Sequence, residues 1–172
     1  MSLLTYEEAR PWAKAIRDEV LNRRMPPWGA VKGFGEFRDD ASLTQEEISR
    51  IAQWVEGGAP EGDPVYLPEK PHAHAAEPLP AGIRIRQLPP KRGVVVLGIH
   101  PLTDIAESRI TAHLPSGIVE PLIWLRDYKQ KWNRTFLYRE PLKLPAGTRI
   151  VAEPPVPFEL LVIAGSTSGA RR

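Results

Sequence analysis

The sequence predicts an α+β chain of two parts, a short α-helical region followed by an antiparallel β-sandwich. Three observations lead to this prediction. Apolar residues recur every three to four positions in the first 60 residues, which is the period of an amphipathic helix. From about residue 81 they alternate with a period of two, as in half-buried strands. Between the two patterns, residues 59–80 hold six of the 19 prolines.

We expect two helices in the first part. Thr5 and Glu8 form a capping box at which the first helix begins. Its apolar stripe consists of Ala9, Trp12, Ala13, Ile16, Val20 and Leu21. Pro11 lies early in this stripe and predicts a kink or a late start. The corner Met25-Pro26-Pro27 is expected to end the helix.

The second helix begins at another capping box, Thr44 to Glu47. It ends at Gly57-Gly58, a typical left-handed C-cap. Residues 29–41, between the two helices, contain three glycines and no apolar period, so they predict a loop with two aromatic anchors, Phe34 and Phe37.

The second part shows seven short β-branched or alternating runs separated by turn signals, which is typical of an antiparallel sandwich. The runs are 83–86, 94–99, 109–114, 118–125, 135–140, 148–153 and 158–163, with breaks expected at 115–117, Pro141, 145–147 and 154–155. The expected organisation is thus a helical region at 1–60, a proline-rich linker at 61–80, the sandwich at 81–168 and a tail at 169–172.

Composition excludes several classes of protein. The net charge is +2, with no clustered Lys/Arg face, so we expect no nucleic-acid partner. The chain has no cysteine, which excludes disulfides, thiolate metal sites and a Cys-x-x-Cys-His haem attachment. The first residues lack the features of a signal peptide, and no apolar run reaches a membrane span.

Met25 is one of only two methionines, the other being Met1. The two prolines after it hold it at a rigid corner, a placement in which a thioether can be an axial ligand of haem iron. The alternative is that Met25 fills an irregular gap below the helix end.

Three stretches of the helical region resemble the C-terminal part of a bacterial c-type cytochrome domain: 2–13, Arg24-Met25-Pro26-Pro27-Trp28, and 43–60. In exported multidomain proteins this domain is commonly joined to a β-sandwich similar to the copper type II, ascorbate-dependent monooxygenases. Residues 121–128, Trp132 and 138–150 resemble that sandwich. The resemblance implies haem c or copper as family cofactors, Met25 as the distal axial ligand, and a periplasmic or exported location.

The chain departs from both family sites. The haem-attachment segment would precede Met1, so either the chain is a fragment or it descends from a haem protein without keeping the haem. The family's copper-binding His-x-His pair corresponds to His100 and Leu102, and the second part has no methionine. The chain as written therefore predicts no cofactor.

A true His-x-His does occur at His72 and His74, in the linker. These residues, with His100, are the candidate metal ligands. His113 is expected to be a satisfied histidine. Trp124, Trp132 and Tyr138 either line a groove or pack in the core. No set of catalytic residues stands out.

The sequence favours a non-enzymatic binding or structural module derived from an exported redox protein. One alternative is a fragment of a haem-containing electron-transfer protein in which Met25 is the distal ligand. Another is a copper-dependent monooxygenase-like enzyme. The partner, whether protein or small molecule, is not indicated, and a homodimer is compatible with the expected open strands.

Overall fold

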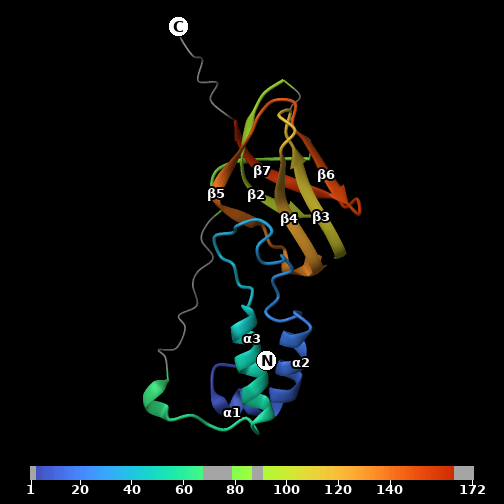
Figure 1. Cartoon of the computed structure of the whole chain (residues 1–172). Helices are drawn as coiled ribbons and strands as arrows, with labels where there is room; N and C mark the ends of the chain where they lie inside the picture. The colour runs from blue at the N-terminus through green and yellow to red at the C-terminus, as the bar shows by residue number, and fades with distance from the viewer. Residues whose placement is uncertain (1–2, 68–78, 87–90, 165–172) are drawn as a thin grey trace. The chain divides into compact units, whose positions relative to one another are not determined.

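The computed structural model describes residues 3–67, 79–86 and 91–164. The chain forms two compact units, each built from two segments. The helical unit combines Met1–Pro26 with Ser42–Leu79, and the sandwich unit combines Pro27–Ala41 with Pro80–Arg172. The chain therefore passes between the units three times. Figure 1 shows the helices and the two sheets.

The helical unit contains three α-helices and two short 3₁₀ helices within the described part of the chain. They are α1 (Tyr6–Ala9), η1 (Arg10–Trp12), α2 (Ala13–Leu21), α3 (Gln45–Glu56) and η2 (Pro64–Tyr66). Pro11 lies in the first turn of η1, so the predicted kink is a 3₁₀ turn between α1 and α2.

Both ends of α3 follow from its sequence. Thr44 and Glu47 form the expected capping box, in which each side chain accepts a hydrogen bond from the other's backbone N–H, at 3.2 and 2.7 Å. At the other end Gly58 is left-handed, with φ 89°. The N–H groups of Gly58 and Ala59 donate back to the carbonyls of Val55 and Trp54, which closes the helix.

The predicted end of the first helix was wrong by four residues, because α2 stops at Leu21. Arg23 adopts the left-handed conformation, with φ 56°. The N–H groups of Arg23 and Arg24 then donate to the carbonyls of Val20 and Glu19, at 3.0 and 2.9 Å. This is the same closure as in α3, but an arginine stands where glycine is usual, so the sequence gives no stop signal before the prolines.

The helical unit has a thin core. Among its described residues only four are buried: Ala13, Val20, Ile48 and Ala59. Two side-chain hydrogen bonds supplement this packing, from the Tyr6 hydroxyl to the Ala59 carbonyl and from the Trp54 indole to the Pro60 carbonyl, both 2.9 Å. So small a core contributes little burial energy, and the unit depends heavily on its helix caps.

All seven predicted strands are present in the sandwich unit. They are β1 (Ile83–Ile85), β2 (Val94–Pro101), β3 (Ile105–His113), β4 (Val119–Tyr128), β5 (Phe136–Leu144), β6 (Arg149–Glu153) and β7 (Phe158–Ala164), with η3 (Gln130–Trp132) before β5. They form two antiparallel sheets, β1-β7-β2-β5 and β4-β3-β6. The predicted break at Pro141 does not occur, because β5 lies at a sheet edge and passes through it.

One hydrophobic core lies between the two sheets. It takes side chains from both sheets, among them Ile99, Phe136 and Leu160 on one side and Ile110, Ile123 and Leu125 on the other. The buried Tyr138 hydroxyl of β5 donates to the Leu122 carbonyl of β4 at 3.1 Å, which joins the sheets across the core. Burial raises the pKa of Tyr138, so it stays neutral and remains a donor.

Residues 27–41, here called the strap, belong to the sandwich and not to the helical region in which we predicted them. Near its start the strap pairs with the edge of β4, where the Val31 N–H donates to the Trp124 carbonyl at 2.8 Å. Near its end it pairs with the edge of β5, where the Arg38 N–H donates to the Leu137 carbonyl at 2.9 Å. The strap thus covers one edge of each sheet.

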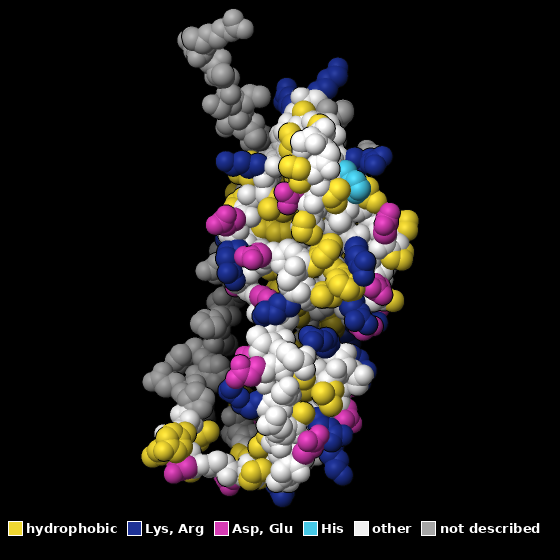
Figure 2. Space-filling model, in the orientation of Figure 1, with side chains coloured by type: hydrophobic (Ala, Val, Ile, Leu, Met, Phe, Trp, Pro, Cys, Tyr) yellow, Lys and Arg dark blue, Asp and Glu magenta, His cyan; other side chains and the backbone are white. Residues whose placement is uncertain are grey.

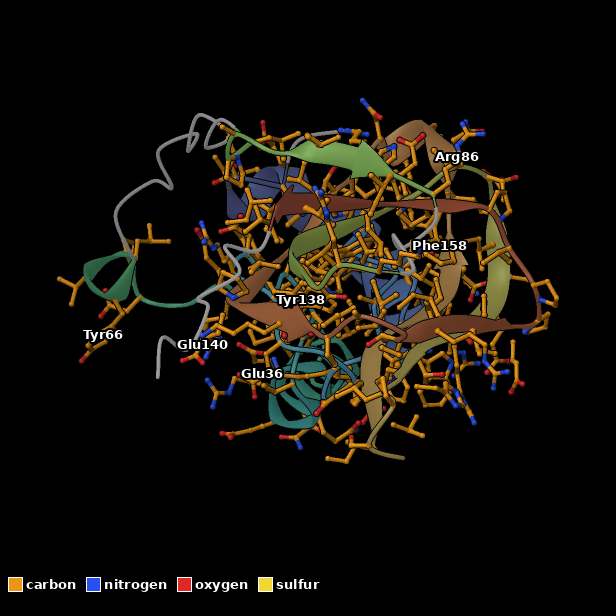
Figure 3. The ribbon with its side chains drawn as sticks, turned by 90° about the horizontal axis from the view of Figure 1, so that it is seen from above. Glu36, Tyr66, Arg86, Tyr138, Glu140 and Phe158 are labelled. Atoms are coloured by element: carbon orange, nitrogen blue, oxygen red, sulfur yellow. The ribbon has the colours of Figure 1, made fainter. Side chains whose placement is uncertain are left out.

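Aromatic side chains explain why the strap packs there. Trp28 and Phe37 are buried in the sandwich core. Trp28 meets Phe136 edge-on at 5.1 Å between ring centroids, and Phe37 stacks on Tyr138 at 5.4 Å. Figure 3 labels Tyr138 on β5 and Glu36 next to Phe37 in the strap. The thin core of the helical unit has no comparable place for these rings.

Other predicted boundaries are only partly described. The linker at 61–80 contains the ordered turn η2, while residues 68–78 and the tail at 169–172 lie outside the described residues. Among the described helices, none combines the length and the apolar character needed to cross a membrane.

Replacing Gly35 with Ala should destabilise the sandwich by at least about 3 kcal/mol. Gly35 has φ +88°, and an added Cβ would lie 2.5 Å from the Leu122 carbonyl oxygen. Gly33→Ala is the matched control, because Gly33 has φ +82° but open space around it. The control should cost about 1 kcal/mol, from the left-handed backbone alone. Urea unfolding of both variants measures this difference, and equal losses would show that the strap does not pack tightly on β4.

Candidate functional site

Met25 lies directly after the closure of α2. Its backbone N–H contacts the Glu19 carbonyl at 3.3 Å, and the neighbouring Arg24 pairs with the Glu19 carboxylate at 2.7 Å. The Met25 side chain is 37% exposed, so it does not fill a closed gap. The thioether therefore lies in the turn after α2, four residues beyond the helix end, and is partly open to solvent.

Among its described residues the helical unit contains one methionine, Met25, and no histidine. All four histidines of the chain lie at positions 72, 74, 100 and 113, beyond α3, and the chain has no cysteine.

His100 lies on β2, and polar contacts to its Nδ1 atom orient the imidazole ring. This atom is 3.1 Å from the Arg134 carbonyl oxygen and 3.2 Å from Thr135 Oγ1. Because a carbonyl can only accept, Nδ1 carries the proton and Nε2 is the acceptor. Partial burial is the main cause that lowers the pKa of His100, and the nearby positive charge of Arg84 lowers it further.

The structure does not test the predicted set of three metal ligands. His72 and His74 lie outside the described residues. Within the part that is described, no three His, Cys, Asp or Glu residues group closely enough to hold a metal ion. His113, expected to be a satisfied histidine, lies 3.2 Å from Thr111 Oγ1 through its Nε2 atom.

The most elaborate surface arrangement surrounds Trp124 on β4. The Arg109 guanidinium lies 4.2 Å from the centre of the indole, and the indole N–H donates to Glu107 Oε1 at 3.1 Å. Phe34 of the strap meets the indole edge-on at 6.1 Å. We call these four residues the tryptophan cluster. Three contacts therefore hold the indole: Arg109 over its ring, Glu107 at its N–H and Phe34 edge-on.

The register of β3 and β4 builds this cluster. Arg109 pairs directly with Trp124, and both residues point away from the core because their neighbours Ile110, Ile123 and Leu125 point into it. From the sequence, core packing was favoured for Trp124 over a place in a groove, but its side chain lies outside the core. The contacts of Trp124 with Glu107, Arg109 and Phe34 were not predicted. The alternation of β3 and β4 could have placed Arg109 on the outer face, but pairing it with Trp124 requires the register.

The other two aromatic residues proposed for a groove pack in the core instead. Tyr138 is buried between the sheets, and Trp132 packs against the core with its ring edge-on to Tyr128. This was the alternative that the sequence left open for them.

A shallow cleft lies at the end of β4, lined by Asp104, Lys129, Gln130 and Lys131, with a volume of about 650 Å³. Its carboxylate is already engaged, since Asp104 accepts from the Gln130 N–H at 2.8 Å and lies 3.6 Å from the Lys129 ammonium. The hydrogen bond from the Gln130 N–H is the main cause that lowers the pKa of Asp104, and the nearby charge of Lys129 lowers it further. The carboxyl group therefore stays ionised. All four described lining residues are polar or charged, whereas most small-molecule sites are lined mainly by hydrophobic and aromatic side chains.

Comparisons of the chain with models of known protein families, with characterised proteins and with solved structures find no match. The resemblance to a cytochrome domain and to the copper monooxygenase sandwich therefore stays a prediction from the residues quoted above.

Replacing His100 with Asn should weaken the pH dependence of stability. Because the pKa of His100 is lowered in the folded protein, the unfolded chain takes up the proton first as the pH falls below about 6.5. The wild-type free energy of unfolding should fall from that pH down to the folded pKa. Asn keeps an N–H donor for the Arg134 carbonyl but does not titrate. Urea unfolding at several pH values tests this, and parallel curves for the two proteins would contradict it.

Proposed function

We propose that this protein is a non-enzymatic binding module, descended from an exported redox protein, that recognises a protein partner through the tryptophan cluster. The observation that carries the proposal is the fixed indole of Trp124 with Arg109 stacked on it at 4.2 Å. Tryptophan and arginine are the residues that most often dominate the energy of protein interfaces.

The architecture of the cluster suits recognition. Its four residues come from the strap, β3 and β4, all within the sandwich unit, so their relative positions are set by the strand register and by the strap. Such preorganisation lowers the entropy cost of binding. The cluster also combines an aromatic surface with a carboxylate and a guanidinium, which can form directional contacts with a partner.

Trp124→Ala should abolish binding of the partner at a cost of only about 1–2 kcal/mol in unfolding free energy, since the side chain lies outside the core. Trp12→Ala is the matched control, because Trp12 is an exposed tryptophan of the helical unit. The measurement is recovery of partners on each variant from cells that make the protein. Partners retained by wild type and Trp12→Ala but lost by Trp124→Ala support the proposal. Retention by all three would contradict it.

A second candidate function is electron transfer, favoured by the exposed thioether of Met25 at its fixed corner. In this candidate Met25 is the axial ligand of a haem carried by another polypeptide segment, which also supplies the proximal histidine. Bound haem would contribute one-electron redox chemistry. The chain itself would hold the thioether in place through the α2 closure and the Arg24–Glu19 pair.

Titrating the protein with a c-type haem peptide that has its own axial histidine tests this candidate. Wild type should change the visible absorption of the peptide on binding. Met25→Leu, which preserves size but not the thioether, should bind at least about tenfold more weakly. Identical titrations for the two proteins would show that Met25 is not a haem ligand.

A further inference from the structure

The most exposed apolar side chains of the described chain are consecutive. Val65, Tyr66 and Leu67 are 80%, 82% and 73% exposed. They belong to Asp63–Leu67, which includes η2 and which we call the hook. Figure 2 shows the hook as a compact group of hydrophobic side chains, and in Figure 3 Tyr66 points away from the ribbon. Isolated exposed apolar residues are ordinary, but three in a row on an ordered turn indicate a docking element.

The hook has a defined conformation. The Asp63 side chain accepts from the Val65 N–H at 2.9 Å, and the Asp63 carbonyl accepts from the Tyr66 N–H at 3.0 Å. A further bond runs from the Leu67 N–H to the Pro64 carbonyl at 3.1 Å, and Pro64 fixes its own φ. The three apolar side chains are therefore presented together before any partner binds, which lowers the cost of docking.

The surroundings of the hook are acidic. Residues 51–67 contain Glu56, Glu61 and Asp63 and no lysine or arginine. An anionic lipid surface would repel this segment, whereas a protein surface with an apolar centre and basic edges would attract it.

The sandwich unit carries a surface of that kind on the outer side of the sheet β1-β7-β2-β5. Val95 and Ile163 are cross-strand partners there, facing away from the core that their neighbours Val96 and Val162 enter. Ile163 is 41% exposed. Lys143, the partner of Val95 on β5, stands on one side of this apolar pair.

Arg84 and Arg86 add positive charge on the β1 side of the same sheet. Both pair with Glu159, at 3.7 and 3.2 Å, so this one carboxylate faces two cations. We call Arg84, Arg86, Val95, Lys143 and Ile163 the basic face. It has an apolar centre, basic edges and a net positive charge, which complements the hook.

We propose that two copies of this chain form a dimer in which the hook of each copy docks on the basic face of the other. Such an exchange is reciprocal, so it closes with two-fold symmetry and leaves neither hook exposed. Tyr66 and Leu67 cover Val95 and Ile163, while Glu56 and Glu61 lie near Arg86 and Lys143. This interface is separate from the tryptophan cluster and does not depend on the function proposed for it.

Sedimentation velocity over a range of protein concentrations tests the dimer. Wild type should associate, with an affinity that falls as salt rises. Tyr66→Ala should raise the dissociation constant at least about tenfold. Ile118→Ala, at another exposed apolar residue outside both surfaces, should leave it unchanged. Wild type that is monomeric at all concentrations, or a dimer insensitive to Tyr66→Ala, would overturn the proposal.

Charge-reversal variants of the two surfaces distinguish a loss of docking from a loss of folding. A copy with Glu56→Lys and Glu61→Lys should not self-associate, because residues 51–67, which include the hook, then carry a net positive charge, as the basic face does. A copy with Arg86→Glu and Lys143→Glu should not self-associate either, because both of its surfaces are negative. Mixed together, the two variants should form a heterodimer with complementary contacts at both hooks. Failure to associate on mixing, while wild type dimerises, would refute this pairing of surfaces.

Discussion

The structure depends on the backbone hydrogen bonds that the strap makes with the edges of both sheets. Val31 bonds to β4 and Arg38 to β5, while Trp28 and Phe37 enter the core between them. Without the strap, two sheet edges and the aromatic surface around Phe136 and Tyr138 would face water. The strap precedes the rest of the sandwich in the chain by the whole of α3 and the linker. Closing the sandwich therefore requires contacts between residues far apart in the chain, which makes its folding slow relative to a fold built from local contacts.

The sequence predicted those features whose physical cause is local. The seven strands follow from apolar alternation between turn residues, and the ends of α3 follow from Thr44, Glu47 and Gly58. The sequence did not predict where the strap packs, because its partners, such as Leu125 for Ala30 and Tyr138 for Phe37, are about a hundred residues away and the segment has no period of its own. It also missed the end of α2, where Arg23 takes a conformation normally signalled by glycine.

The candidate sites also differ in whether they depend on neighbouring residues in the chain or on distant ones. Met25 was proposed from its neighbours in the chain, since two prolines follow it directly. The tryptophan cluster could not be proposed in this way, because Arg109 meets Trp124 only through the register of β3 and β4. The surface carries exposed apolar side chains as well as ion pairs. Glu159 is paired with Arg84 and Arg86, whereas Val65, Tyr66 and Leu67 are exposed.

Native-state hydrogen exchange tests the role of the strap most directly. The strap account predicts that the amide protons of Val31 and Arg38, which bond to the two sheet edges, exchange only by global unfolding of the sandwich. Their opening free energies should then equal those of the core amides of Ile110 and Leu125 and should fall in parallel with them as denaturant is added. If the strap amides instead exchange through a local opening of much lower free energy, with the core amides still protected, the sandwich is stable without its strap and the account is wrong.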